Sequence, residues 1–129
     1  MVIDTSAIVA ILLDEPDGDH FTAAIEQDEL RLMSAVGRVE LTMVIEGRGG
    51  ASGLALLEQL LRTFGVEIVA VTPAHADIAI DAFRRFGRGR HKAGLNMGDC
   101  FTYALAKALD VPLLFKGDDF AWTDIRVAR

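Results

Sequence analysis

MVIDTSAIVAIL (residues 1–12) joins a very short apolar strand to a helix, and the rest of the expected fold is arranged around this pair. Met1 to Ile3 predict a buried strand, and Ser6 predicts the N-cap of a helix over residues 7–13. Asp4 lies between them, where turn and capping residues are common. A carboxylate at the end of so short a buried strand is either a local cap or part of a functional site.

Strand-like and helix-like segments alternate along the rest of the chain. We expect helices over residues 17–27, 35–48, 54–64, 73–86 and 99–109, with a Gly-rich break at 47–53 and a Gly-rich basic loop at 87–98. Further strands are expected over residues 30–34, 66–71 and 111–115, with a last edge strand at 125–128. The alternation predicts an α/β fold with helices on both faces of a central, mainly parallel sheet of four to five strands.

Length and composition narrow the class of protein. A chain of 129 residues with 51% hydrophobic residues predicts one folded domain over residues 1–129. The net charge of −6 is unlike that of a general nucleic-acid binder, and the single Cys100 excludes an internal disulfide or a multi-cysteine zinc site. No apolar run approaches the roughly 20 residues of a membrane helix, so we expect a soluble cytoplasmic protein.

Acids follow two of the expected strands. Asp4 comes directly after residues 1–3, and Asp118 and Asp119 come shortly after the strand at 111–115. In a parallel α/β sheet, ligands bind in the crevice at the carboxyl ends of the strands. These acids are therefore candidates for one shared site, although each alone is also a common turn residue.

Two further acids lie on expected helices. Glu40 has Val36, Met43 and Val44 as its helical neighbours, so it belongs to the apolar face that we expect to point inward. Asp99 comes three residues after Asn96, so it fits a capping box as well as a site at the helix start. The alternative for Glu40 is an ion pair with an arginine.

Acids from distant segments that share one rim would repel one another. Two like charges 4 Å apart cost about 4 kcal/mol at an effective dielectric of 20, so such a cluster requires protons or a cation. Carboxylate oxygens without a histidine or cysteine set suit Mg²⁺ or Mn²⁺. Such an ion can activate water and stabilise a leaving oxygen in phosphodiester cleavage.

A basic stretch leads directly to Asp99. Residues 82–98 contain no acid, and they hold five of the 13 Lys and Arg residues: Arg84, Arg85, Arg88, Arg90 and Lys92. Cations beside an acidic metal site can bind the phosphates of RNA. The alternatives are a solvated helix end, where basic residues favour the helix dipole, and pairing with acids of a protein partner.

Four stretches together resemble the PIN-domain nucleases, and most closely the VapC toxins of bacterial toxin–antitoxin pairs. They are MVIDTSAIVAIL (1–12), VELTMVIEG (39–47), LNMGDCFTYALAK (95–107) and LLFKGDDFAWTDI (113–125), in the order of the family. The resemblance covers essentially the whole chain. It implies a PIN-like three-layer α/β/α sandwich and a metal-dependent endoribonuclease that forms homodimers and is silenced by a cognate VapB-like antitoxin.

The resemblance also implies roles for individual residues. Asp4, Glu40 and Asp99 match the acidic positions of the family. Many relatives carry a fourth acid three residues before the motif's Phe, but here that position is Gly117; Asp118 and Asp119 are both candidates, and the KGxDF form favours Asp119.

In these roles, Asp4 and Asp99 are the main metal ligands, Glu40 binds through water or positions the attacking water, and the fourth acid completes the site. Thr5, Ser6, Asn96 and Asp118 are expected to orient carboxylates or waters. The expected products carry a 5′-phosphate and a 3′-hydroxyl.

Three other readings of the sequence remain open. A receiver-like Mg²⁺-binding signalling domain requires an acceptor Asp after a middle strand, which is absent here, and a DxD phosphatase requires an acid where Ser6 stands. A non-catalytic α/β binding module, with the acids as caps, is the third. The helices at 54–61 and 17–27 are expected to expose a groove for a partner chain, and Cys100, Tyr103 and Trp122 are expected to be packing residues.

Overall fold

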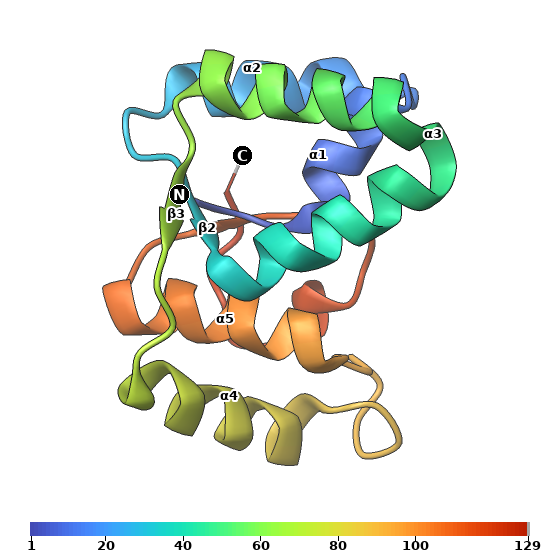
Figure 1. Cartoon of the computed structure of the whole chain (residues 1–129). Helices are drawn as coiled ribbons and strands as arrows, with labels where there is room; N and C mark the ends of the chain where they lie inside the picture. The colour runs from blue at the N-terminus through green and yellow to red at the C-terminus, as the bar shows by residue number, and fades with distance from the viewer. Residues whose placement is uncertain (129) are drawn as a thin grey trace.

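The computed structural model describes residues 1–128 and contains the expected alternation of strands and helices (Figure 1). The elements are β1 (Val2–Ile3), α1 (Thr5–Leu12), α2 (Gly18–Gln27), β2 (Leu32–Ser34), α3 (Ala35–Phe64), β3 (Glu67–Val69), α4 (Pro73–Phe86), α5 (Met97–Leu109), β4 (Leu113–Leu114) and the short 3₁₀ turn η1 (Phe120–Trp122). Over residues 1–128, no helix combines the length and apolarity required to span a bilayer.

The sheet is parallel throughout its four strands, with the order β3-β2-β1-β4. The predicted α/β fold is therefore confirmed. The expected edge strand at 125–128 is reduced to one parallel bridge between Leu113 and Val127, next to β4. Because β1 is a central strand, the crevice beyond its carboxyl end is bordered by neighbours on both sides.

Successive side chains of β1, β2 and β4 point to opposite faces of the sheet, so each of these strands contributes to both hydrophobic cores. Val2, Leu32 and Leu113 pack with α4 and α5 on one face, and Ile3, Met33 and Leu114 pack with α1 to α3 on the other. Figure 1 shows these layers, with α5 directly against the sheet and α4 outside it. The register pairs Val2 with Leu32 and with Leu113, which puts these three side chains on one face.

The break predicted at 47–53 is present, but it is confined to Gly50, and the chain is helical on both sides of it. Residues 35–64 form one helix that bends where Gly50 takes non-helical torsions (φ 56°, ψ −149°). Such torsions are essentially limited to glycine, so one residue provides the whole break. The bend lets the second half of α3 turn back over α1 (Figure 1).

Both helices next to the acids begin earlier than predicted. Helix α1 begins at Thr5, and its N-cap is Asp4 rather than Ser6. Helix α5 begins at Met97, two residues before the expected start, with Asn96 as N-cap and Asp99 at the third helical position in a complete capping box. Asp4 and Asp99 therefore each have a structural role at a helix start.

Candidate active site

Asp4 is held at the carboxyl end of β1 with only 5% of its surface exposed. Its Oδ2 accepts hydrogen bonds from the Ser6 backbone N–H (3.0 Å) and from the Ser6 hydroxyl (2.6 Å). Burial raises the pKa of Asp4, and the hydrogen bonds from Ser6 and Thr102 oppose this effect. Within residues 1–128, Asp4 takes part in none of the ion pairs, so hydrogen bonds alone stabilise its buried carboxylate.

Asp99 lies in the first turn of α5, where its Oδ2 accepts a hydrogen bond from the Asn96 backbone N–H at 3.1 Å. The pKa of Asp99 is raised to about 7, first by burial and then by the charges of Asp4, Glu40 and Asp119, while the Asn96 hydrogen bond opposes the rise. The structure thus brings the four predicted acids within electrostatic reach of one another. The charges of Asp4, Glu40 and Asp119 all act on the carboxyl group of Asp99.

The Glu40 side chain extends from α3 toward the other acids, and its carboxylate lies against Gly98 of α5. A Cβ at Gly98 would lie 2.8 Å from Cδ and 3.0 Å from Oε1 of Glu40, so only glycine admits the carboxylate there. Burial raises the pKa of Glu40, and the charge of Asp4 adds to this, while the nearby Thr5 hydroxyl lowers it. In the structure the single proton of the Thr5 hydroxyl is donated to the Gly37 carbonyl at 3.3 Å, so the hydroxyl holds its place between α1 and α3.

The face of α3 that carries Glu40 is not core, contrary to the sequence-based expectation. Met43 is 68% exposed, and the neighbouring Val39 is 60% exposed. Together with Met97 they border an apolar surface hollow of about 520 Å³ beside Glu40 and Gly98. Glu40 is therefore half-buried at the edge of an exposed apolar surface.

The segment after β4 brings the fourth acid. The Lys116 backbone N–H donates to the Ser6 hydroxyl at 3.0 Å, which ties this segment to the start of α1. Asp118 and Asp119 both follow and are exposed, but only Asp119 is among the charges that raise the pKa of Asp99. This electrostatic effect on Asp99 favours Asp119 for the fourth position, as the KGxDF form does.

The four acids form a donor set of oxygen atoms alone. Within the described part of the chain, no three Asp, Glu, His or Cys side chains lie as close together as the ligands of an assembled metal site. The four acids nevertheless offer only hard oxygen donors, and Asp4 and Asp99 are buried and mutually repelling. These residues fit Mg²⁺ or Mn²⁺ in donor chemistry and in charge, because a cation would relieve the repulsion.

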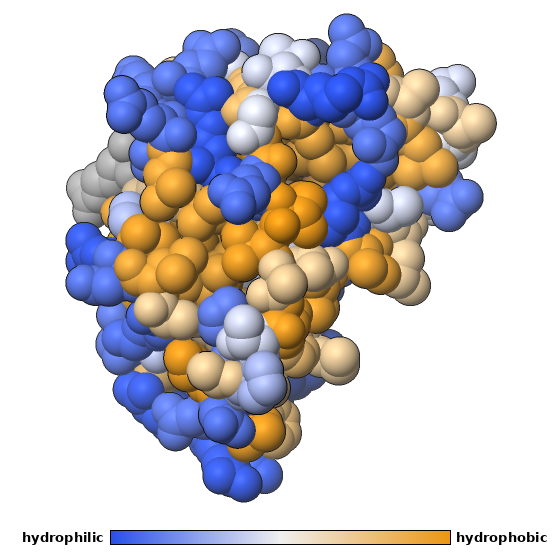
Figure 2. Space-filling model, turned by 60° about the vertical axis from the view of Figure 1, so that its left-hand side comes forward, coloured by the Kyte–Doolittle hydropathy of each residue, from blue (hydrophilic) through white to orange (hydrophobic). Residues whose placement is uncertain are grey.

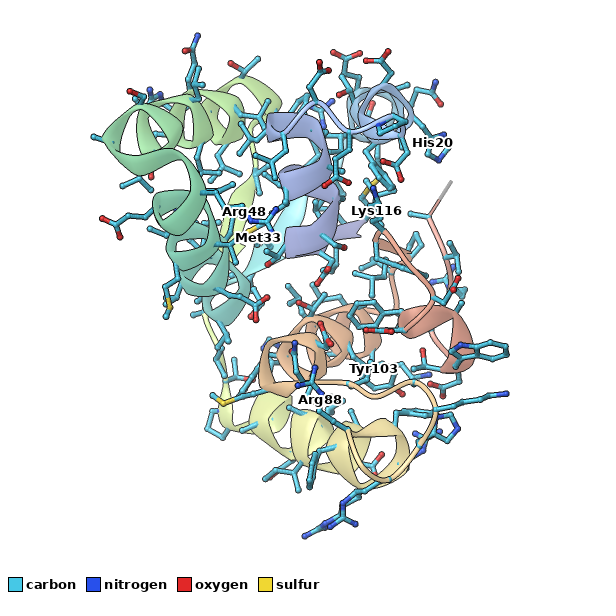
Figure 3. All side chains as sticks on the ribbon, turned by 90° about the vertical axis from the view of Figure 1, so that its right-hand side faces the viewer. His20, Met33, Arg48, Arg88, Tyr103 and Lys116 are labelled. Atoms are coloured by element: carbon cyan, nitrogen blue, oxygen red, sulfur yellow. The ribbon has the colours of Figure 1, made fainter. Side chains whose placement is uncertain are left out.

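The basic residues divide into two groups. Arg85 is occupied by ion pairs with Asp81 (3.3 Å) and Asp124 (3.4 Å), and Arg84 is exposed at the end of α4. Arg88 lines the same hollow as Asn96 and Met97, so it lies beside the start of α5; Figure 3 labels it next to that helix.

Arg90 and Lys92 instead cover aromatic rings. The Arg90 guanidinium lies 4.8 Å from the centroid of Phe83, and the Lys92 Nζ lies 3.8 Å from that of Trp122. Trp122 is 50% exposed, so its expected packing role is wrong. Cys100 and Tyr103 are buried as expected.

Several residues of the site escape prediction from the sequence. Gly98 is needed for a contact between two helices, and Thr102, which hydrogen-bonds Asp4, is buried one turn after Asp99. The signal for Thr102 is its position at i+3 from Asp99, which puts both on one helix face. Asp124 was also missed; it accepts a hydrogen bond from the Tyr103 hydroxyl at 2.6 Å and pairs with Lys107 at 2.9 Å.

Known proteins share both the sequence and the fold. The family model for the PIN domain matches residues 1–125. The chain is 54% identical over 125 residues to Ribonuclease VapC30 of Mycobacterium tuberculosis, a match that covers 97% of this chain and 95% of that protein. It is 52% identical to Ribonuclease VapC of Mycolicibacterium smegmatis, covering 97% of each.

Solved structures agree in fold at low identity. The crystal structure of M. tuberculosis VapC20, described as a toxin that cleaves the sarcin–ricin loop, superposes with a TM-score of 0.79 at 12% identity, covering 96% of this chain and 95% of that one. A toxin–antitoxin complex from Klebsiella pneumoniae gives a TM-score of 0.67 at 16% identity, covering 95% and 92%. The chain belongs to the PIN-domain family and, within it, to the VapC group.

Proposed function

We propose that this protein is the toxin of a toxin–antitoxin pair and acts as a metal-dependent endoribonuclease. The observation that carries the proposal is the convergence of Asp4, Glu40, Asp99 and Asp119 at the carboxyl end of β1, with the pKa of Asp99 raised to about 7. The relatives named as VapC ribonucleases support the reaction class. A receiver or a DxD phosphatase would not account for four acids drawn from four separate segments.

The roles of the side chains follow from their surroundings. Asp4 and Asp99 would hold Mg²⁺ or Mn²⁺, with Ser6, Thr102 and Asn96 fixing the two carboxylates by hydrogen bonds. When bound, the ion would polarise the scissile phosphate and lower the pKa of a water.

Glu40 is the candidate base that accepts a proton from the attacking water. Its pKa is raised by burial and by the charge of Asp4, which moves it toward the pH at which a base works best. Asp119, which is exposed, would complete the cation's surroundings. Attack by water leaves a 5′-phosphate and a 3′-hydroxyl.

The basic segment is the proposed path of the RNA. Arg88 lies beside the start of α5 and would contact a phosphate close to the acids, and Arg84, Arg90 and Lys92 would extend the contact along the same segment. Arg85 contributes less, because Asp81 and Asp124 already pair with it.

Two apolar surfaces support the proposed protein partners. A groove between α1 and the second half of α3 is lined by Leu12, Leu56 and Leu60. The sequence had suggested that the helix at 17–27 would form one side of it, but α1 takes that place. We assign this groove to a VapB-like antitoxin, in line with the Klebsiella toxin–antitoxin complex. The exposed Val39, Met43 and Met97 form the proposed homodimer face.

RNA cleavage by purified protein tests the proposal. Wild type should cleave single-stranded RNA in Mg²⁺ or Mn²⁺, EDTA should abolish the cleavage, and Asp4→Asn should reduce it at least about a hundredfold. Expression should arrest growth, and co-expression of the neighbouring small gene should restore it. Equal cleavage by Asp4→Asn and wild type would refute the site and identify a contaminating nuclease.

A further inference from the structure

We propose that Trp122 and Lys92 together form a stacking site for one unpaired base of the RNA, next to the acidic site. The inference rests on the proposed ribonuclease function and identifies the part of the substrate that this surface recognises. Trp122 is the single tryptophan of the chain, and half of its surface is exposed. An exposed indole ring offers an apolar face on which a nucleotide base can stack.

Trp122 is positioned one turn from the acids. It ends the 3₁₀ turn η1, whose N-cap is Asp119, and its backbone N–H donates to the Asp119 carbonyl at 3.4 Å. Three residues of a 3₁₀ helix advance about 6 Å, so the backbone of Trp122 lies one turn from that of Asp119, whose charge acts on Asp99. A base on this ring would thus lie close to the phosphodiester bond at the acids.

The turn that presents the ring is anchored on both sides. Phe120 is buried and packs against Phe115 with ring centroids 5.2 Å apart. The Thr123 hydroxyl donates to the Phe120 carbonyl at 2.6 Å, and Asp124 is tied to α5 by Tyr103 and Lys107. Figure 3 labels Tyr103 on the α5 side of this junction. An aromatic group on a fixed support loses little freedom when a base stacks on it.

Lys92 adds a positive charge to this surface, which can attract the phosphate of a nucleotide. Its Nζ lies 3.8 Å from the Trp122 ring centroid and comes from the acid-free segment 82–98. A nucleotide offers both matching groups, because its base stacks on the indole and its phosphate attracts the ammonium on its flexible stem. An acidic peptide would match the ammonium alone, so the pair favours RNA over a protein ligand.

Fluorescence tests the inference directly, since Trp122 is the only tryptophan. A short single-stranded oligoribonucleotide, added in EDTA so that it stays intact, should quench the emission in a saturable way. An abasic oligonucleotide of the same length should bind more weakly and quench little. Binding of the intact oligonucleotide, followed by anisotropy of a terminal dye, without any change in emission would overturn the proposal.

Variants separate stacking from general binding. Trp122→Ala should weaken oligonucleotide binding about 5- to 100-fold, whereas Trp122→Phe should retain most of the affinity. Leu109→Ala removes a comparably exposed apolar side chain at the other end of α5 and should leave the affinity unchanged. Equal affinity of Trp122→Ala and wild type would reject the base site while metal-dependent cleavage by wild type continued, so failure here is distinct from failure of the ribonuclease assignment.

Discussion

Gly98 makes the position of the Glu40 carboxylate possible. A methyl group there would meet the Cδ of Glu40 at 2.8 Å, and the flexible end of the glutamate would have to move. The helix itself tolerates alanine at this position, since Gly98 lies in the first turn of α5. The contact therefore serves the site more than the fold.

Gly98→Ala should reduce RNA cleavage about 10- to 100-fold, because displacing a positioned catalytic group by an ångström costs that much. The free energy of unfolding in urea should change by less than about 1 kcal/mol. The matched control is Gly47→Ala in α3, where a new methyl meets no atom within 4 Å. That variant should cleave like wild type and be more stable by about 0.5–1 kcal/mol. Full activity of Gly98→Ala would show that the Glu40 position is unimportant.

Asp99→Asn should separate catalysis from stability. The amide oxygen can still accept the Asn96 N–H, so the capping box is kept while the charge beside Asp4, Glu40 and Asp119 is removed. Cleavage should fall at least about a hundredfold. In EDTA at pH 8 the melting temperature should rise by roughly 2–4 °C, because repulsion is relieved.

The matched control is Asp110→Asn, which should preserve cleavage. Asp110 is the C-cap at the far end of α5 and has a left-handed conformation (φ 52°). A melting temperature of Asp99→Asn below that of wild type would contradict the repulsion argument.

At this scale the sequence indicated candidate acids but not their surroundings. Asp4 stood out because it follows a strand, where topology brings side chains to one rim, and Asp99 because it lies in the first turn of a helix. Gly98 and Trp122 were not, because a close approach between helices and an exposed ring depend on tertiary packing. Met43 was misjudged for a related reason, since helical periodicity finds an apolar face without showing what covers it.

At the element scale, Asp124 connects α4, α5 and the C-terminal segment. Burial raises the pKa of Asp124, but the hydrogen bond from Tyr103 and the charges of Lys107 and Arg85 outweigh it and lower the pKa to about 2. A carboxyl group whose pKa is lowered on folding stabilises the fold above its unfolded value of 3.8, and the contribution is lost as pH falls toward 2.

Asp124→Asn should therefore lower the free energy of unfolding by about 1 kcal/mol at pH 7, since a charged acceptor of several hydrogen bonds is lost. The difference from wild type, measured by urea unfolding, should stay constant from pH 7 to 5 and shrink below pH 4. Asp77→Asn, an exposed position on α4, should behave like wild type throughout. A difference that is unchanged down to pH 3 would mean that the charge of Asp124 does not stabilise the fold.

Order and type of the elements were predictable, but their limits were not. Alternating apolar segments indicated every strand of the parallel sheet. The stretch GRGGASG contains the predicted break, but only Gly50 leaves the helical region, and the glycine content does not show which residue does so. The Asp4 cap was assigned to Ser6 because both residues are good caps, and only the backbone torsions distinguish them.

At the scale of the whole molecule, apolar surface remains outside the two cores. Figure 2 shows apolar side chains across the face on the β3 side, and Ile68 of β3 and Val71, just after this strand, are exposed. The face formed by Val39, Met43 and Met97 is more exposed still and lies beside Glu40. Apolar residues of this size on a surface are expected to bind a partner.

Met43→Glu should convert the proposed homodimer into a monomer, because a charge at the centre of an apolar contact is strongly unfavourable. Sedimentation velocity at micromolar concentration measures this directly, and Leu56→Glu in the separate groove between α1 and α3 is the control that should remain dimeric. Monomeric wild type under the same conditions would exclude the homodimer.

The proposed ribonuclease requires that carboxylates from separate segments share a divalent cation. Titration of Mn²⁺ into metal-free protein, followed by electron paramagnetic resonance of the free ion, counts bound ions without any assay of activity. Wild type should bind Mn²⁺ saturably, Asp110→Asn should match it, and Asp99→Asn should lose at least about tenfold in affinity. Equal binding of Mn²⁺ by Asp99→Asn and wild type would contradict the claim.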